Sequence, residues 1–148
     1  MPQFFETQRE RFTISTDPAR LDLDTICEFL KRSYWANTRP RERTERALQN
    51  SLVFGMYDGT KQIGLARVIS DYTIFAYLCD VFIDEGYRAH GLGKWLMKTI
   101  MEHPELRDVR RWLLVTNDAH GLYKQFGFST MDDPERWMQK FEPFPQEP

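Results

Sequence analysis

The sequence predicts an α/β fold in which helices pack against one central sheet. The β-rich runs 52–57 and 62–69 are joined by a short glycine-containing loop, a pattern typical of a β-hairpin. The nearly all-apolar run 73–83 is followed by a glycine-rich turn and then by apolar residues at helical spacing. A second strand and helix of this kind begin at residue 112. Two strand-helix units after a hairpin indicate helices covering a sheet.

The first third of the chain supplies one strand and two helices. Residues 12–16 alternate and are rich in β-branched side chains, so we expect a strand that Asp17-Pro18 ends. Apolar residues recur at helical spacing from Leu23 to Tyr34 and predict a first helix. Residues 41–49 are charged and favour helix, with few apolar contacts. They predict a second, more exposed helix.

The later elements follow the two strand-helix units. Asp80 is the only charged residue within 73–83, so we expect this strand in the interior of the sheet. Asp118 is a candidate cap for a short helix. We expect, in order, a helix at 92–102, a buried strand at 112–116, a short helix at 119–125, a last strand at 136–141 and a frayed tail at 143–148.

Composition limits the function classes. With 148 residues, 41% of them hydrophobic, the chain has the size of one domain spanning 1–148. A formal net charge of -2 gives no global basic field, so we expect no nucleic-acid or membrane partner. No apolar run approaches the roughly 18 residues of a membrane span, and no signal-like start is present, which favours a cytoplasmic protein. Cys27 and Cys79 lack metal-like spacing, so we expect reduced cysteines and no metal.

The glycine-rich turn 88–94 is the main functional signal. A helix N-terminus carries unpaired N–H donors and a partial positive charge, and glycine lets a phosphate approach closely. A nucleoside-triphosphate loop is disfavoured because Arg88 stands at its first glycine position and Trp95 at its Ser/Thr position. A dinucleotide loop is disfavoured because Leu96 stands where its third glycine belongs.

Two motifs together resemble the GNAT superfamily, the Gcn5-related N-acetyltransferases. The first is Arg-x-x-Gly-x-Gly at Arg88, Gly91 and Gly93, between a strand and a helix. The second is Ala-x-x-Leu-Tyr-x-x-x-Gly-Phe at 119–128. The resemblance covers nearly the whole chain. It implies a mixed, mostly antiparallel sheet of about six or seven strands, flanked by about four helices and splayed open where acetyl-CoA binds.

The resemblance also implies which residues bind acetyl-CoA, the cosubstrate. The strand residues would pair with the pantetheine arm, and the turn would hold the pyrophosphate through its N–H groups. Thr116 stands where the family often has an asparagine, so adjacent Asn117 becomes the candidate for that contact. The expected coenzyme-binding residues are Val81, Phe82, Ile83, Arg88, Ala89, His90, Gly91, Leu92, Gly93, Lys94, Asn117, Ala119 and Tyr123.

Acetyl transfer to an amine requires an unprotonated nucleophile, a donor to the thioester oxygen and a proton for the departing thiolate. Tyr123 matches the tyrosine that the family places beside the coenzyme sulfur, so we expect it to be the general acid; packing alone is the alternative. The family often has a glutamate base at the position of Tyr77. Asp80 is therefore the candidate base, and the alternative is a structural carboxylate paired with an arginine such as Arg67.

The acceptor is expected near the first two helices. Tyr34 and Trp35, together with Tyr77, are the candidate substrate-binding residues, and simple packing is their alternative role. The arginines at 39, 41, 43 and 46 are interspersed with glutamates, which favours a solvated helix over an acidic-acceptor site.

The sequence is consistent with two functions. The first is an acetyl-CoA-dependent N-acetyltransferase that acts on a primary amine of a small molecule or peptide, by direct attack in a ternary complex. The second is a non-catalytic acyl-CoA-binding or regulatory module of the same fold, motivated by Tyr77 and Thr116. Homodimers are common in the family, but no exposed apolar stripe in the sequence predicts one.

Overall fold

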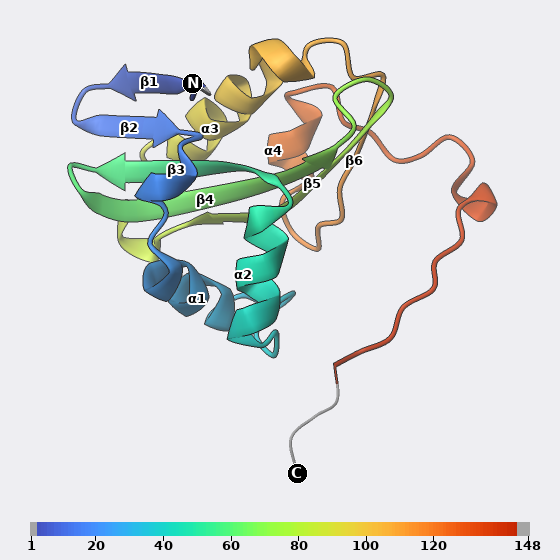
Figure 1. The fold of residues 1–148 in the computed structure, drawn as a ribbon. Helices are drawn as coiled ribbons and strands as arrows, with labels where there is room; N and C mark the ends of the chain where they lie inside the picture. Colours follow the sequence, from blue (N-terminus) through green and yellow to red (C-terminus); the bar gives the residue numbers. More distant parts are fainter. Residues whose placement is uncertain (1–2, 145–148) are drawn as a thin grey trace.

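A six-stranded sheet forms the centre of the computed structural model, which describes residues 3–144 (Figure 1). The strands lie in the sheet in the order of the sequence. The first five pair antiparallel, and β6 pairs parallel with β5. The strands are β1 (Glu6–Arg9), β2 (Phe12–Ser15), β3 (Leu52–Asp58), β4 (Lys61–Ser70), β5 (Phe75–Ile83) and β6 (Arg111–Leu113).

Helices cover both faces of the sheet. The helices are α1 (Leu23–Lys31), α2 (Arg41–Gln49), α3 (Leu92–Met101) and α4 (His120–Lys124). Helices α1 and α2 lie on one face, and α3 and α4 lie on the other (Figure 1). The α1 face buries a small core in which Phe29 stacks on Phe82, with ring centroids 4.8 Å apart. The α3 face holds the larger core, which includes Leu96 and Ile100. The predicted α/β class and the mostly antiparallel sheet are confirmed.

A β-bulge in β5 changes which side chains face each layer. The register with β4 pairs Phe82 with Leu65 but Cys79 with Arg67, so Asp80 and Val81 together oppose one residue. Asp80 has a φ of 52°, in the left-handed region. Before the bulge, the buried Leu78 packs in the α3 core, whereas after it the buried Phe82 packs in the α1 core. Asp80 therefore faces the α1 and α2 side.

Strand β6 covers only the first part of β5. The pairs run from Phe75–Arg111 to Tyr77–Leu113, and β5 continues to Ile83. In the described part of the chain, no strand pairs with this side of residues 78–83. We call this side of 78–83 the open edge of β5. The sheet is thus open at the place where the resemblance implied a splay.

Most predicted elements are confirmed within two or three residues at their ends. The strand predicted as buried at 112–116 is instead a half-buried strand that ends at Leu113, and Val115 is exposed. The 41–49 helix is reproduced, as are the hairpin of β3 and β4 and the helix predicted at 92–102. Strand β1 was missed because its exposed residues do not alternate; it is held as an edge strand by pairing with β2. Its turn places Glu10 at a φ of 57° without a glycine to signal it.

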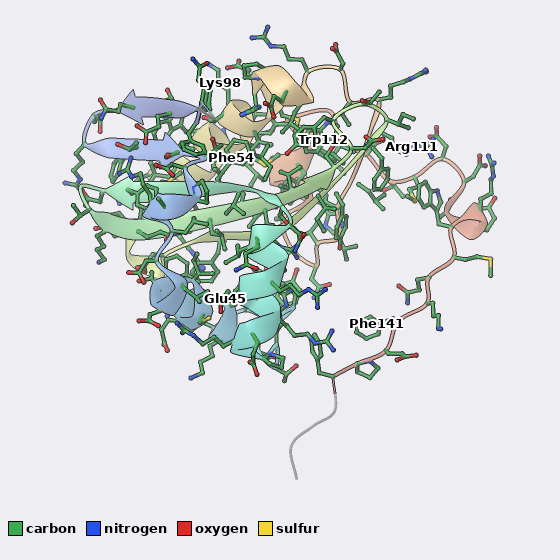
Figure 2. The ribbon with its side chains drawn as sticks, in the orientation of Figure 1. Glu45, Phe54, Lys98, Arg111, Trp112 and Phe141 are labelled. Atoms are coloured by element: carbon green, nitrogen blue, oxygen red, sulfur yellow. The ribbon has the colours of Figure 1, made fainter. Side chains whose placement is uncertain are left out.

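The predicted last strand at 136–141 is wrong. The segment contains no strand: a 3-10 turn at Pro134–Arg136 is followed by exposed, irregular chain. Alternation alone does not form a strand without an edge to pair with. The Arg111 guanidinium instead lies 5.2 Å from the Trp137 ring centroid, and Figure 2 shows Phe141 on an arm away from the sheet. Of the expected frayed tail, Phe144 packs beneath Arg43, and 145–148 lie outside the described residues.

Candidate active site

The turn at 88–94 presents a row of backbone donors. Ala89 and Gly91 have φ values of 69° and 73°, and this left-handed geometry in a short turn directs neighbouring N–H groups to one side. Within the described residues, the N–H groups from Ala89 to Lys94 make no hydrogen bond. A Cβ added at Gly91 would meet nothing within 4 Å. The turn and the start of α3 can therefore hold an anion closely.

Arg88 braces this turn against the end of β5. Its Nε donates to the Ile83 carbonyl at 2.8 Å, and its guanidinium lies 5.0 Å from the Phe82 ring centroid. The Nη2 of Arg88 is 3.7 Å from Glu85. The Ile83 carbonyl is thus already occupied. The expected contact between the Arg88 charge and a pyrophosphate stays a prediction, because this side chain is turned back toward the strand.

The segment after β6 is shaped by Thr116. Its Oγ1 accepts from the Ala119 N–H at 3.0 Å and therefore satisfies a donor at the start of α4. The prediction that Asp118 caps this helix is wrong. In the described residues, the Asp118 carboxylate accepts no hydrogen bond from the first N–H groups of α4. The exposed Asn117 donates its backbone N–H to Tyr34 Oη at 2.9 Å. Thr116 thus closes the turn that leads into α4.

Tyr123 lies at the α4 end of the site. Its side chain is buried, and its ring packs edge-on to Phe128 with centroids 5.9 Å apart. Burial, with smaller contributions from Tyr34 and Asp118, raises the pKa of Tyr123 to about 12. Its hydroxyl makes no hydrogen bond among the described residues. Tyr123 is therefore a neutral phenol at neutral pH, and its role as general acid stays a prediction.

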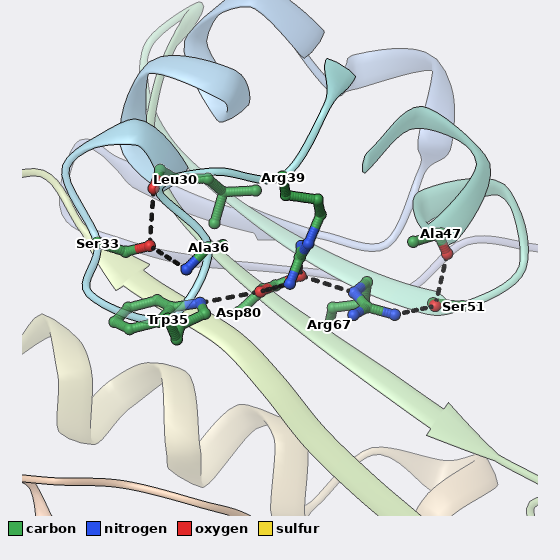
Figure 3. A network of polar contacts seen from close by, with 9 residues as sticks. All are labelled: Leu30, Ser33, Trp35, Ala36, Arg39, Ala47, Ser51, Arg67 and Asp80. Atoms are coloured by element: carbon green, nitrogen blue, oxygen red, sulfur yellow. Dashed lines mark hydrogen bonds and ion pairs between the residues drawn. The ribbon is translucent and has the colours of Figure 1, made fainter. Parts of the chain in front are cut away.

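Asp80 is fully engaged by three side chains (Figure 3). Arg39 donates from Nη1 and Nη2 at 2.8 and 3.2 Å, and Arg67 donates from Nε at 2.8 Å. Trp35 Nε1 adds a fourth hydrogen bond at 2.9 Å. Burial by itself raises the pKa of Asp80, but the hydrogen bonds and charges of Arg39 and Arg67 outweigh it and hold that pKa below its usual value. The alternative of a structural carboxylate paired with Arg67 is what the geometry shows.

The three candidate acceptor residues are brought to the same face of the sheet. Tyr34 and Trp35 are partly exposed and pack edge to face, with centroids 5.0 Å apart. Burial is the main cause that raises the pKa of the half-buried Tyr77, and electrostatic interactions with Cys79 and Asp80 raise it further. Substrate binding by these residues stays a prediction. Tyr34 is 49% exposed, so simple packing leaves about half of this residue in contact with solvent.

Arg39 was missed as a member of the site. The sequence places it in an arginine-rich stretch that favours a solvated helix, and Arg41 fits that interpretation through its exposed pair with Asp24. Arg39 precedes Pro40, outside the helix, and its side chain is only 17% exposed. Its position in an irregular connection before a proline was the one signal that could have separated it from its neighbours.

Cys79 is unsuited to form an acetyl-enzyme. Burial raises its pKa to about 11, so the thiol is protonated at neutral pH and is a poor nucleophile. Among the described residues, no group of three or more His, Cys, Asp or Glu side chains could hold a metal ion. None of the helices in residues 3–144 has the length and apolar character that crossing a membrane would need.

Comparison with known proteins decides the family. The model of the acetyltransferase (GNAT) family matches residues 21–128, which include the open edge of β5, the turn and α4. The chain belongs to the GNAT acetyltransferase family. FG08082 of Gibberella zeae, which carries the name of an acetyltransferase, is 33% identical over 143 residues, covering 80% of each chain.

Solved structures agree with this GNAT assignment. A GNAT-family protein from Xanthomonas campestris pv. campestris is 40% identical, with a TM-score of 0.85 over 97% of this chain and 96% of that one. A Clostridium acetobutylicum protein shares the fold at a TM-score of 0.62 and 12% identity, over 94% and 95% of the two chains. That protein was solved with acetyl-CoA.

Proposed function

We propose that this GNAT protein is an N-acetyltransferase that uses acetyl-CoA and acts as one domain over residues 1–148. The observation that carries the proposal is the row of unbonded N–H groups from Ala89 to Lys94 beside the open edge of β5. A diphosphate needs such donors, and an amide-containing arm can pair with an unpaired strand edge. The family membership and the acetyl-CoA in the Clostridium acetobutylicum protein support this choice of acyl donor.

The pantetheine arm would lie along Val81 to Ile83, with the pyrophosphate at the turn. The arm carries two amides, whose groups match the unpaired backbone groups of the edge. Arg88 Nε already donates to the Ile83 carbonyl, and the register with β4 directs the backbone groups of Phe82 toward Leu65, so pairing at the open edge would concern Val81 first. His90 and Lys94 are exposed next to the turn, and Lys94 adds charge to the N-terminus of α3.

The chemical step would be direct. The nitrogen lone pair of the amine attacks the thioester carbon, and the carbonyl oxygen becomes an oxyanion that the backbone N–H of Val81 stabilises. The C–S bond then breaks and its electron pair leaves on sulfur, while the Tyr123 hydroxyl donates a hydrogen bond to the developing thiolate and passes its proton to it. The raised pKa of Tyr123 keeps the phenol neutral before this transfer, and the phenolate left behind regains a proton from solvent. The attacking nitrogen releases the extra proton that it carries after attack, so the products are the neutral amide and free coenzyme A.

Asp80 has a different role in this proposal from the base expected from sequence. A carboxylate whose pKa is lowered and whose oxygens each accept two hydrogen bonds is a weak proton acceptor. We assign Asp80 instead to holding the connection between α1 and α2 against β5. The ammonium group of the acceptor would lose its proton to solvent water before attack, and Tyr77 supplies no base at the position where the family often has a glutamate.

Position 77 holds a tyrosine and no acidic residue. This favours the second candidate, a non-catalytic acyl-CoA-binding module. Two measurements separate the candidates: calorimetry with acetyl-CoA, then thiol release across a panel of primary amines that includes small polyamines, amino sugars and peptide N-termini. Coenzyme binding with thiol release for an amine supports the enzyme. Binding without release for any amine supports the module, and failure to bind acetyl-CoA contradicts both.

A further inference from the structure

A continuous line of contacts crosses from β5 to the segment after β6. Asp80 accepts from Trp35 Nε1 at 2.9 Å, and Trp35 packs edge to face with Tyr34. Tyr34 Oη accepts from the Asn117 N–H at 2.9 Å, although 83 residues separate the two in sequence. Asp80 lies on β5 beside the open edge, and Asn117 lies beyond the end of β6. Tyr34 therefore spans the place where β5 and β6 part.

The two aromatic residues in this line are held very differently. Trp35 is tied to a buried carboxylate that two arginines also hold, and Ser33 Oγ fixes the turn before it by bonding Leu30 and Ala36 (Figure 3). Tyr34 is 49% exposed, and its ring is held by the edge contact with Trp35 and the single bond to Asn117. Rotation of Tyr34 about its side-chain bonds therefore needs one hydrogen bond to break and leaves Trp35 in place.

We propose that Tyr34 closes the open edge of β5 in the free protein and that acetyl-CoA binds by displacing the Tyr34 phenol from Asn117. This inference rests on the proposed function, because it takes the pantetheine arm to lie between β5 and the segment after β6. An arm in that position passes the Asn117 N–H. Its amide carbonyls are acceptors of the same kind as Tyr34 Oη, so the N–H exchanges one acceptor for another.

Tyr34→Phe tests the displacement because it removes the phenol oxygen and keeps the ring. The matched control is Tyr72→Phe, which changes a tyrosine of similar exposure in the connection between β4 and β5. Calorimetry should show acetyl-CoA binding to Tyr34→Phe about 2- to 10-fold more tightly than to the wild type, since one net hydrogen bond no longer has to break. Tyr72→Phe should bind like the wild type.

Amide hydrogen exchange at Asn117, measured by NMR, gives a second readout that does not depend on global stability. In the free protein, Asn117 exchange should be about 2- to 10-fold faster in Tyr34→Phe than in the wild type, and acetyl-CoA should slow it in both. Unchanged or weaker coenzyme binding by Tyr34→Phe, or an Asn117 exchange rate that acetyl-CoA does not change, would overturn the inference and leave the proposed function standing. If the wild type itself does not bind acetyl-CoA, both fail.

Discussion

Arg39 donates two hydrogen bonds to the carboxylate of Asp80 across a sequence separation of 41 residues. The pair joins the connection between α1 and α2 to a bulged residue in the middle of β5, and Arg67 on β4 completes it. Both partners of the Arg39–Asp80 pair are largely buried, with side chains 17% and 2% exposed. The pair therefore ties the connection between α1 and α2 to the sheet.

Replacement of Asp80 by asparagine should destabilise the protein. Asp80→Asn leaves the largely buried guanidinium groups of Arg39 and Arg67 without their counter-charge, and breaking a buried pair of this kind costs about 3 to 5 kcal/mol. Urea unfolding measures the loss. The control is Arg41→Met, which removes an exposed pair with Asp24 and should leave the unfolding midpoint near that of the wild type. Equal stability of Asp80→Asn and the wild type would contradict the structural role.

The same carboxylate predicts an acid limit to stability. The pKa of Asp80 is lower in the folded chain than the ordinary value of about 4, so the unfolded chain binds its proton first as pH falls. The stabilisation from Asp80 is therefore complete above about pH 5 and is lost as pH falls through the folded pKa, below about 4. The difference in unfolding free energy between wild type and Asp80→Asn should shrink over that range. A difference that stays constant from pH 6 to pH 3 would show that the ionised carboxylate is not its source.

Removal of the Tyr123 phenol should impair the chemical step. Loss of a general acid lowers kcat by about 10²- to 10⁴-fold, and Tyr123→Phe should leave the acetyl-CoA Kd within about twofold because the buried ring still packs on Phe128. The pKa of Tyr123, raised to about 12, means that its ionisation should not limit the rate below about pH 10. Thiol release measured from pH 6 to pH 10 tests both points. An unchanged kcat over that range would remove Tyr123 from the mechanism.

The turn before α3 allows a matched pair of glycine substitutions. Gly91 and Gly59 have φ values of 73° and 61°, and a Cβ would meet nothing within 4 Å at either. Alanine should therefore cost each site a similar backbone strain of about 1 kcal/mol. Only at Gly91 would the added methyl group enter the proposed pyrophosphate site. Calorimetry should show acetyl-CoA binding weakened about tenfold or more by Gly91→Ala and unchanged by Gly59→Ala. Equal Kd values for the two variants would place the coenzyme elsewhere.

The sequence predicted the elements whose patterns are local. Helical spacing gave α1 and α3, the glycine loop gave the hairpin of β3 and β4, and two short motifs identified the family. The orientation of Asp80 could not be predicted, because the bulge that turns it toward Arg39 depends on pairing with β4. The false strand at 136–141 has a similar cause, since strand formation depends on an available edge. The bond between Tyr34 and Asn117 joins distant segments and had no sequence signal.

Backbone amide NMR during an acetyl-CoA titration shows whether the coenzyme binds at the turn before α3 and along the open edge of β5. We expect the largest chemical-shift changes on the amides of residues 81–83 and 89–94 and on Asn117, while the hairpin amides at 59–61 keep their shifts. Saturable binding whose shifts lie outside these three segments, or the absence of any shift, would contradict this expectation.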